Sequence, residues 1–396
     1  MATWDKFNYG PEARNWGESW IPATVDGTGG AVIYFHGAGF ESGTTEQFYD
    51  AAQGEAFFLE QIETREASGS ANERTCCFSI KVAEHRYDQT HSGIDAWADG
   101  ILYAFGAYVS YSGSNYICIT GHTSATANDR PSDGTNWTLY WRVSPKNDLG
   151  GKRRPTFTTD TPAYGASGLM DALLAYNYIV EHAPQYNFDP TKVVVMGQSA
   201  GGQKMSAIIW NLMGSRMPYV DPGAFNPHRL RTAQRPAGAI FRQTWDTLAN
   251  QPNSVVAAEA WGARLIGRPF TSDEWDDYPD DLKNSISNLG ILNMTQDASV
   301  PCYFEYVTTG QQHDDGVDNT PPYSTDDAHH PKNGWQIFDA VVDTYGGANC
   351  IFVEDHDGSD TTRRYDNSTS TYGTFERTGT NLSADMWTWY ESVTGV

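Results

Sequence analysis

The stretch VVVMGQSAGG, residues 193–202, carries the clearest structural signal in this chain of 396 residues. Its first four residues are apolar and mostly β-branched, which predicts a buried strand, and residues 204–212 have the pattern of a helix. Gly197 and Gly201 allow the backbone to turn sharply between the two elements. This strand, turn and helix would place Ser199 at the carboxyl end of a strand and at the start of a helix.

Strands and helices alternate along most of the chain. Residues 31–35 predict a buried strand that ends at a glycine turn, and the segments that follow alternate in the same way. The further predicted helices cover residues 46–66, 169–183, 335–345 and 382–393, and the further predicted strands cover residues 76–82, 192–196, 237–244, 301–308 and 350–353. Such alternation predicts an α/β fold, with a mostly parallel sheet flanked by helices.

One segment interrupts this alternation. Residues 94–150 are rich in glycine, tryptophan and tyrosine and contain short alternating stretches, so they predict a small all-β insertion. The α/β domain would then consist of residues 1–93 and 151–396. Within its second part, the irregular acidic stretch at about residues 246–297 is expected to form a lid-like region.

Composition excludes several classes of partner. The chain has 26 Lys and Arg against 49 Asp and Glu, a formal net charge of −23, which repels nucleic acid and anionic membranes. No apolar run is long enough to span a membrane, and the start of the chain shows no Sec signal pattern. We therefore expect a soluble protein, and both an extracellular and a virion-associated location are compatible with this. The five cysteines have no CxxC spacing, which favours buried thiols over a zinc site.

The serine turn suggests nucleophilic chemistry. A serine hydroxyl is a weak nucleophile, so it needs a base within hydrogen-bond reach and amide donors for a developing oxyanion. A second glycine-rich segment, HGAGF at residues 36–40, directly follows a predicted strand. Its small residues would let main-chain N–H groups approach a substrate carbonyl.

The two motifs together resemble the carboxylesterase and hormone-sensitive-lipase-like branch of the α/β-hydrolases, with HGAGF in place of HGGGW and GQSAGG around the serine. The resemblance implies a serine esterase that works through an acyl-enzyme, without a cofactor. It also implies an oxyanion hole formed by the amides of Ala38, Gly39 and Ala200. The alanine at position 38 departs from the usual glycine but keeps its main-chain donor.

The resemblance also indicates the base. The order in this family is serine, then an acid after the penultimate strand, then a histidine after the last strand. The turn EDHDG at residues 354–358 follows the last predicted strand, so His356 is the expected base. The histidines at positions 85, 91, 122, 182 and 228 come too early in the chain and are expected to have structural or surface roles.

The acid has more than one candidate. The loop after the strand at residues 301–308 contains several aspartates, and one of them should orient His356. In similar esterases the acid comes a few residues before a helix-opening proline and about thirty residues before the histidine, which favours Asp327. Asp314 and Asp315 remain alternatives because they lie closer to the strand. The same loop could hold calcium, but a solvated loop is the commoner outcome and no metal is expected.

The aromatic insertion resembles the small chitin- and cellulose-binding type of carbohydrate-binding module, and similar segments in phage tail proteins. The residues that carry this resemblance are Trp97, Tyr103, Gly106, Val109, Tyr111, Gly113, Tyr116, Cys118, His122, Pro131, Trp137 and Trp141. Exposed aromatic rings stack on the apolar faces of sugars, so Trp137, Trp141 and Tyr111 are the expected substrate-binding residues. The alternative is that these rings form the core of a module too small to fold otherwise.

The expected substrate is an ester on an acylated polysaccharide, such as an acetyl or feruloyl ester, with lipid-like and polyester substrates left open. Two other functions remain. A peptidase on the same fold would use the same triad. A glycan-binding or virion structural protein with a vestigial hydrolase domain would account for the insertion. The sequence makes no prediction of the oligomeric state.

Overall fold

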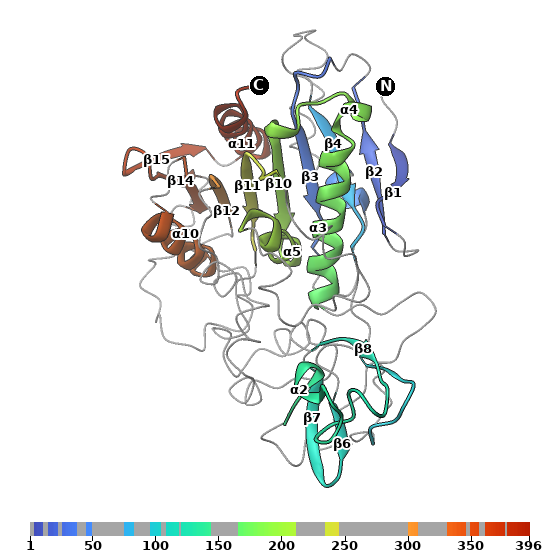
Figure 1. Cartoon of the computed structure of the whole chain (residues 1–396). Helices are drawn as coiled ribbons and strands as arrows, with labels where there is room; N and C mark the ends of the chain where they lie inside the picture. The colour runs from blue at the N-terminus through green and yellow to red at the C-terminus, as the bar shows by residue number, and fades with distance from the viewer. Residues whose placement is uncertain are drawn as a thin grey trace.

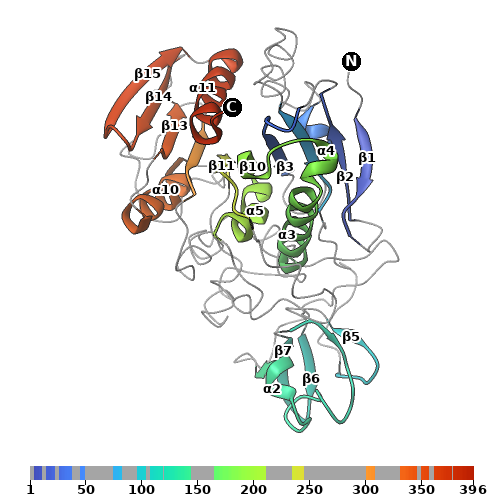
Figure 2. The same ribbon diagram turned by 45° about the horizontal axis from the view of Figure 1, so that its top comes forward.

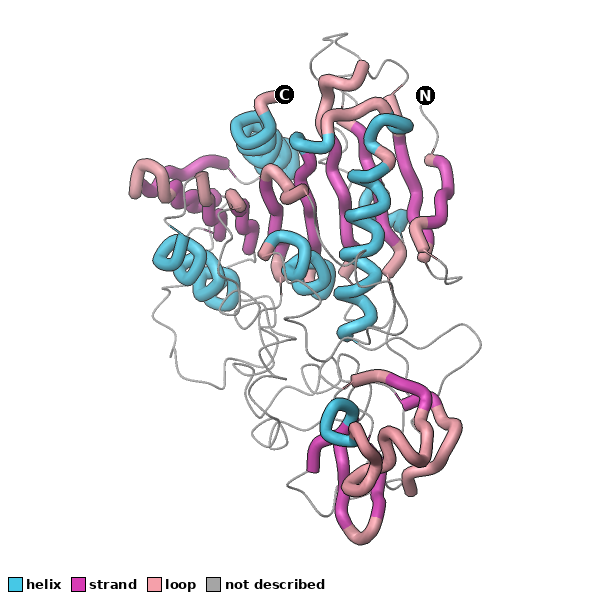
Figure 3. The backbone as a smooth tube through the Cα atoms, in the orientation of Figure 1, coloured by secondary structure: helices cyan, strands magenta, loops and turns pink. Residues whose placement is uncertain are grey.

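The computed structural model describes the chain in segments, and only these segments are discussed. They are residues 4–10, 15–22, 26–37, 45–49, 75–82, 96–103, 108–118, 120–143, 165–210, 234–244, 300–307, 331–345, 349–355, 361–376 and 378–396. They form a ten-stranded sheet with helices on both faces, and a small β unit that Figures 1 and 3 draw apart from the sheet.

The large sheet is mixed. Its strands, in spatial order, are β1 (Asp5–Asn8), β2 (Trp16–Trp20), β4 (Cys76–Ile80), β3 (Ala31–Phe35), β10 (Val193–Gln198), β11 (Gly238–Arg242), β12 (Cys302–Tyr306), β13 (Ile351–Asp355), β14 (Thr361–Asp366) and β15 (Thr371–Glu376). The strands from β4 to β13 in this order are parallel. Strands β1 and β2 at one edge, and β14 and β15 at the other, join antiparallel.

The central strands are mostly apolar because helices cover both of their faces. Side chains alternate along a strand, so β3 sends Ile33 and Phe35 into one core and Val32 and Tyr34 into the other. Strand β10 alternates in the same way. The runs that sequence analysis treated as buried strands are therefore shared between two cores.

Three long helices cover one face of the sheet: α3 (Gly165–Glu181), α5 (Ala200–Ile209) and α10 (Pro331–Tyr345). The other face is covered by α11 (Gly379–Thr394) and the short 3₁₀ helix η1 (Thr45–Phe48). Between α3 and β10 lie the short helices α4 (Ala183–Tyr186) and η3 (Pro190–Lys192). Figure 2 shows α3, α5 and α10 along the same layer, with α11 across the sheet from them.

The predicted strands and helices of the α/β pattern are confirmed wherever they fall on described residues. The expectation of a mostly parallel sheet holds for the central strands only. The antiparallel pair β14 and β15 was not predicted, because its residues are largely polar and lack an apolar pattern; β14 is mostly half-buried and β15 mostly exposed. Most of the predicted helix at residues 46–66, and the lid-like region at residues 246–297, lie outside the described residues.

The small β unit, residues 96–143, has a two-stranded and a three-stranded sheet. Its elements are β5 (Leu102–Tyr103), β6 (Tyr108–Tyr111), β7 (Ser114–Cys118), β8 (His122–Thr123), α2 (Trp137–Tyr140) and β9 (Trp141–Val143). The expectation of an all-β insertion is corrected by α2, a single helical turn. Aromatic side chains provide most of the core of this unit.

All five cysteines are buried thiols, as expected. Across the described segments, no three His, Cys, Asp or Glu side chains gather as metal ligands. The acidic loop that was considered for calcium lies outside these segments. None of the helices in these segments has both the length and the apolar character needed to cross a membrane.

Candidate active site

Ser199 occupies a strained turn between β10 and α5. Its φ of 49° and ψ of −119° lie in a region that residues other than glycine rarely adopt. Two main-chain hydrogen bonds hold it there: its N–H donates to the carbonyl of Arg242 at 2.9 Å, and the N–H of Gly202 donates to the Ser199 carbonyl at 3.1 Å. The turn leaves the serine partly exposed at the carboxyl edge of the sheet.

The glycines around Ser199 are required by close backbone contacts. A Cβ at Gly197 would lie 2.5 Å from the Gly201 carbonyl carbon, and a Cβ at Gly201 would overlap the carbonyl oxygen of Phe35 in β3. A Cβ at Gly202 would overlap the Thr244 side chain. The helix therefore starts so close to the sheet that no larger residue fits at these positions, which explains the glycine pattern of the motif.

The segment expected to supply the oxyanion hole begins beside the serine. A Cβ at Gly37 would lie 3.1 Å from the Cβ of Ser199 and 3.0 Å from the Gln198 carbonyl oxygen. Ala200 is buried and is the first residue of α5, so its N–H belongs to the positive end of a helix. Ala38 and Gly39 lie outside the described residues, so their predicted roles stay predictions.

His36 is held neutral beneath this segment. It is fully buried, and its Nδ1 lies 3.2 Å from the Gly37 carbonyl oxygen, to which the Nδ1–H tautomer donates. Burial, followed by the charges of Lys204 and Lys81, holds the pKa of His36 well below its ordinary value. The expected place of His36 in the oxyanion segment stays a prediction.

A buried ion pair lies next to the serine turn. Arg242 Nε, at the end of β11, donates to Glu305 Oε2 in β12 at 2.9 Å. Neither residue was predicted from the sequence as part of the site. The available signal was a charged side chain within each of two otherwise apolar strands.

The expected base follows the end of β13. His356 lies outside the described residues, but the residue before it, Asp355, is buried and pairs in register with Thr362 of β14. Beside it, Arg363 Nε donates to Glu354 Oε1 at 2.7 Å. The described residues on either side of His356 therefore belong to two antiparallel neighbouring strands, a pairing that was not predicted from the sequence.

The three candidate acids, Asp327, Asp314 and Asp315, also lie outside the described residues. The helix that follows them is described, and α10 begins at Pro331. This agrees with the expectation that a proline opens the next helix four residues after Asp327. The described residues do not distinguish between the three candidate acids.

In the small β unit, Trp141 is a core residue. Its side chain is only 1% exposed and packs edge-to-face against Tyr103 at 5.0 Å between ring centroids, and against His122 at 5.3 Å. Stacking on a sugar requires an open ring face. The expectation that Trp141 binds substrate is therefore wrong.

Trp137 and Tyr111, the other two expected binding residues, have partly exposed side chains. Trp137 is partly exposed, with one edge against Tyr116 at 5.9 Å. Tyr111 is also partly exposed, but the guanidinium of Arg130 lies 5.7 Å from its ring centre, and its hydroxyl donates to Asp133 at 3.3 Å. Trp137 and Tyr111 thus remain candidates for ring contacts with a ligand.

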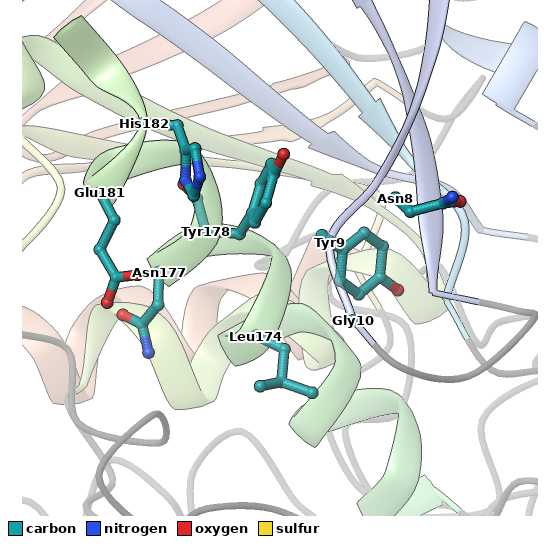
Figure 4. Close-up of a pocket in the computed structure, with 8 residues that line it drawn as sticks. All are labelled: Asn8, Tyr9, Gly10, Leu174, Asn177, Tyr178, Glu181 and His182. Atoms are coloured by element: carbon teal, nitrogen blue, oxygen red, sulfur yellow. The ribbon is translucent and has the colours of Figure 1, made fainter. Parts of the chain in front are cut away.

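A separate cavity of about 310 Å³ lies between the end of β1 and helix α3 (Figure 4). It is lined by Asn8, Tyr9, Gly10, Leu174, Asn177, Tyr178, Glu181 and His182. The His182 ring stacks on Tyr178 at 4.0 Å and its Nδ1 lies 2.7 Å from the Tyr178 carbonyl oxygen, which is a structural role. This end of α3 leads to the start of β10, whereas Ser199 follows the end of that strand. The cavity is not part of the serine site.

Residues 96–138 match the model of carbohydrate-binding module family 5/12. The resemblance expected from the aromatic pattern is thereby confirmed for this segment. No curated protein matches the chain.

Among solved structures, the chain is similar to bacterial esterases. Thermogutta terrifontis esterase 2 with bound propionate has 14% identity and a TM-score of 0.47 over 100% of this chain and 94% of that one. The same esterase phosphoramylated by tabun has 12% identity and a TM-score of 0.47 over 99% and 95%. Esterase B from Lactobacillus rhamnosis has 13% identity and a TM-score of 0.45 over 86% and 71%. These likenesses are distant, and the roles given to residues below rest on this chain alone.

Proposed function

We propose that this chain is a serine ester hydrolase with an α/β-hydrolase fold. The observation that carries the proposal is Ser199 itself, a non-glycine residue held at a φ of 49° between a buried strand and a helix N-terminus. A strained backbone conformation persists only where the surrounding structure holds it, and such residues cluster at active sites. A serine at a strand-to-helix turn of this kind is the nucleophile position of the α/β-hydrolase motif. Gly37 lies against it, where the expected oxyanion segment begins.

In the proposed reaction, His356 removes the proton from Ser199 Oγ as the oxygen attacks the ester carbonyl. The amides of Ala38, Gly39 and Ala200 stabilise the resulting oxyanion. Collapse breaks the bond to the leaving oxygen, which takes the proton from His356 and departs as the alcohol, leaving an acyl-enzyme. His356 then removes a proton from water as it attacks the acyl group, and returns that proton to Ser199 Oγ as the acid is released.

The strand order supports the assignment of His356 and Asp327. Strands β10, β12 and β13 are parallel and end at the same edge of the sheet. Since β12 is the direct neighbour of β13, the loop that contains Asp327 leaves the sheet beside the turn that contains His356. The chain order of serine, acid and histidine is that of the α/β-hydrolases.

The small β unit supports a polymeric substrate. Its match to a carbohydrate-binding family, together with the partly exposed Trp137 and Tyr111, favours acylated polysaccharide, such as an acetyl or feruloyl ester. Binding of the polymer by this unit would raise the local concentration of ester groups near Ser199.

The test is hydrolysis of p-nitrophenyl esters from acetate to decanoate, by the wild type and by Ser199→Ala. Activity that disappears in the variant is expected, with a preference for short acyl chains. A p-nitroanilide measured in parallel distinguishes a peptidase, which would cleave the amide as well. A wild type inactive on every ester and amide would favour the glycan-binding or virion structural alternative.

A further inference from the structure

A row of polar side chains crosses the sheet directly below Ser199. Gln198 of β10 is in register with Arg242 of β11, which is in register with Glu305 of β12. Side chains in one row of a parallel sheet point to the same face. Glu305 is in turn in register with Val353 of β13, which belongs to the core beneath α11. The polar row therefore lies on the face of the sheet that α11 covers.

Arg242 contacts the serine turn with both its main chain and its side chain. Its carbonyl accepts the Ser199 N–H at 2.9 Å. Its guanidinium lies close enough to Tyr34 that its charge opposes the rise in the pKa of Tyr34 that burial causes. The Tyr34 hydroxyl in turn donates to Gln198 Oε1 at 3.3 Å. Ser199 contacts this arginine directly, and Gln198 is linked to it through Tyr34.

Glu305 connects this arginine to the next strand end. One carboxylate oxygen, Oε2, accepts from Arg242 Nε at 2.9 Å, and the other, Oε1, accepts the N–H of Val307 at 3.1 Å. Its carbonyl also accepts the N–H of Gln243 at 2.7 Å. Val307 is the point at which the chain leaves β12 for the loop that contains the proposed acid.

The pair is poorly explained by stability alone. Arg242 is 7% exposed and Glu305 2% exposed, in a face that is otherwise mostly apolar. Removing two charges from water costs about as much as their attraction returns, so apolar residues of similar size often stabilise a protein equally well. The ion pair adds directional hydrogen bonds, because the donors of the guanidinium and the acceptors of the carboxylate have a fixed geometry at two adjacent strand ends.

We infer that Arg242 and Glu305 are positioning residues that fix the strand ends of β11 and β12, and so orient Ser199 relative to the loop of the proposed acid. The inference rests on the proposed function, because it assigns a role in the reaction of Ser199. Neither residue is placed in contact with substrate.

The experiment replaces the pair by apolar residues in the double variant Arg242→Met, Glu305→Leu. A matched control, Arg364→Met with Asp385→Leu, removes an ion pair of the same chemistry between β14 and α11, where Arg364 Nε donates to Asp385 at 3.0 Å. For each protein we would measure urea unfolding, kcat and KM for p-nitrophenyl acetate, and the rate at which an organophosphonate labels Ser199, followed by mass spectrometry.

We expect the double variant to unfold near the wild-type urea concentration, while kcat and the labelling rate fall roughly 10- to 100-fold, since small misplacements of reacting groups cost this much. KM should change by less than about twofold, because no residue that contacts substrate has been altered. The control should react at the wild-type rate.

Arg242→Lys provides a second variant if the double variant does not fold. It retains the charge but loses the Nε donor and the fixed geometry of the guanidinium, so the labelling rate should still fall severalfold. Labelling of either folded variant at the wild-type rate would overturn the inference alone. A wild type that neither hydrolyses the ester nor is labelled would overturn the proposed function, and the inference with it.

Discussion

At the scale of single residues, Ser199 depends on its neighbours for a conformation that it would not adopt alone. A positive φ costs a residue other than glycine about 1–3 kcal/mol. The compensation comes from the hydrogen bonds to Arg242 and Gly202 and from glycines that allow the close approach of helix and sheet. The reactive residue is thus held by sterics that can be tested one position at a time.

Gly201→Ala should disrupt this turn. The new methyl group would overlap the carbonyl oxygen of Phe35, and backbone atoms cannot move aside as a flexible side chain can. We expect a loss of about 1–3 kcal/mol in the free energy of unfolding, together with loss of esterase activity, measured by urea denaturation and ester hydrolysis. Gly373→Ala is the matched control, because a Cβ there meets nothing within 4 Å. Equal stability of the two variants would contradict this account.

Lys204 makes the stability depend on pH. Burial, and then the charge of Lys81, lower its pKa to about 7, and Asp171 partly opposes the shift. Between this pKa and its ordinary value near 10.5, the unfolded chain binds a proton that the folded chain lacks. Stability should therefore rise with pH across this window, whereas below pH 7 the cost of burying the charge is fully present.

Lys204→Met removes the group that titrates. Both proteins would be unfolded in urea from pH 6.5 to 9.5. As pH rises, the free energy of unfolding of the wild type should increase relative to that of the variant, by about 1.4 kcal/mol per pH unit at most. Parallel curves for the two proteins would show that Lys204 keeps an ordinary pKa in the folded state.

At the scale of elements, the small β unit is stabilised by aromatic rings, for which the sequence left open a role in the core and a role in ligand binding. Tyr103, Tyr116 and Trp141 are all buried, in a unit of fewer than fifty described residues. Units of this size bury too little surface to lose any large side chain without consequence.

Trp141→Ala should therefore unfold this unit. Removal of a buried tryptophan costs about 3–5 kcal/mol, so amide hydrogens across residues 96–143 should lose their protection in hydrogen exchange while those of the large sheet keep theirs. Leu139→Ala is the control, because Leu139 is 61% exposed. If protection in this unit persists in the tryptophan variant, Trp141 is not essential to its core.

At the scale of the whole molecule, the serine site and the small β unit should contribute separately to turnover of a polymer. The double variant Tyr111→Ala, Trp137→Ala removes the two partly exposed rings of the unit and leaves Ser199 unchanged. We expect hydrolysis of acetylated polysaccharide to fall several-fold at low polymer concentration, with unchanged hydrolysis of p-nitrophenyl acetate.

Tyr372→Ala tests for a general effect of losing an exposed aromatic ring, since Tyr372 is 53% exposed on β15, outside the unit. It should leave both activities unchanged. An unaltered rate on the polymer in the Tyr111 and Trp137 variant would exclude these rings as a binding surface and leave the unit without a role in turnover.

The sequence by itself determined the parts of this protein that local sterics and patterning control. The buried runs at β3 and β10, the glycine turn around Ser199 and the helix that begins at Pro331 follow from side-chain size, alternation and backbone freedom within a few residues. Predictions for His356, Asp327, Ala38 and Gly39 also came from the sequence, and they stay predictions.

Only the tertiary structure decided which residues meet across long separations in the chain. Arg242 and Glu305 are 63 residues apart, and their pairing depends on the register of two parallel strands. Trp141 and Trp137 are near neighbours with similar side chains, yet one is buried and the other partly exposed. In both cases the local sequence leaves the alternatives, a paired or unpaired charge and a buried or exposed ring, nearly equal in free energy, and packing against segments distant in the chain decides between them.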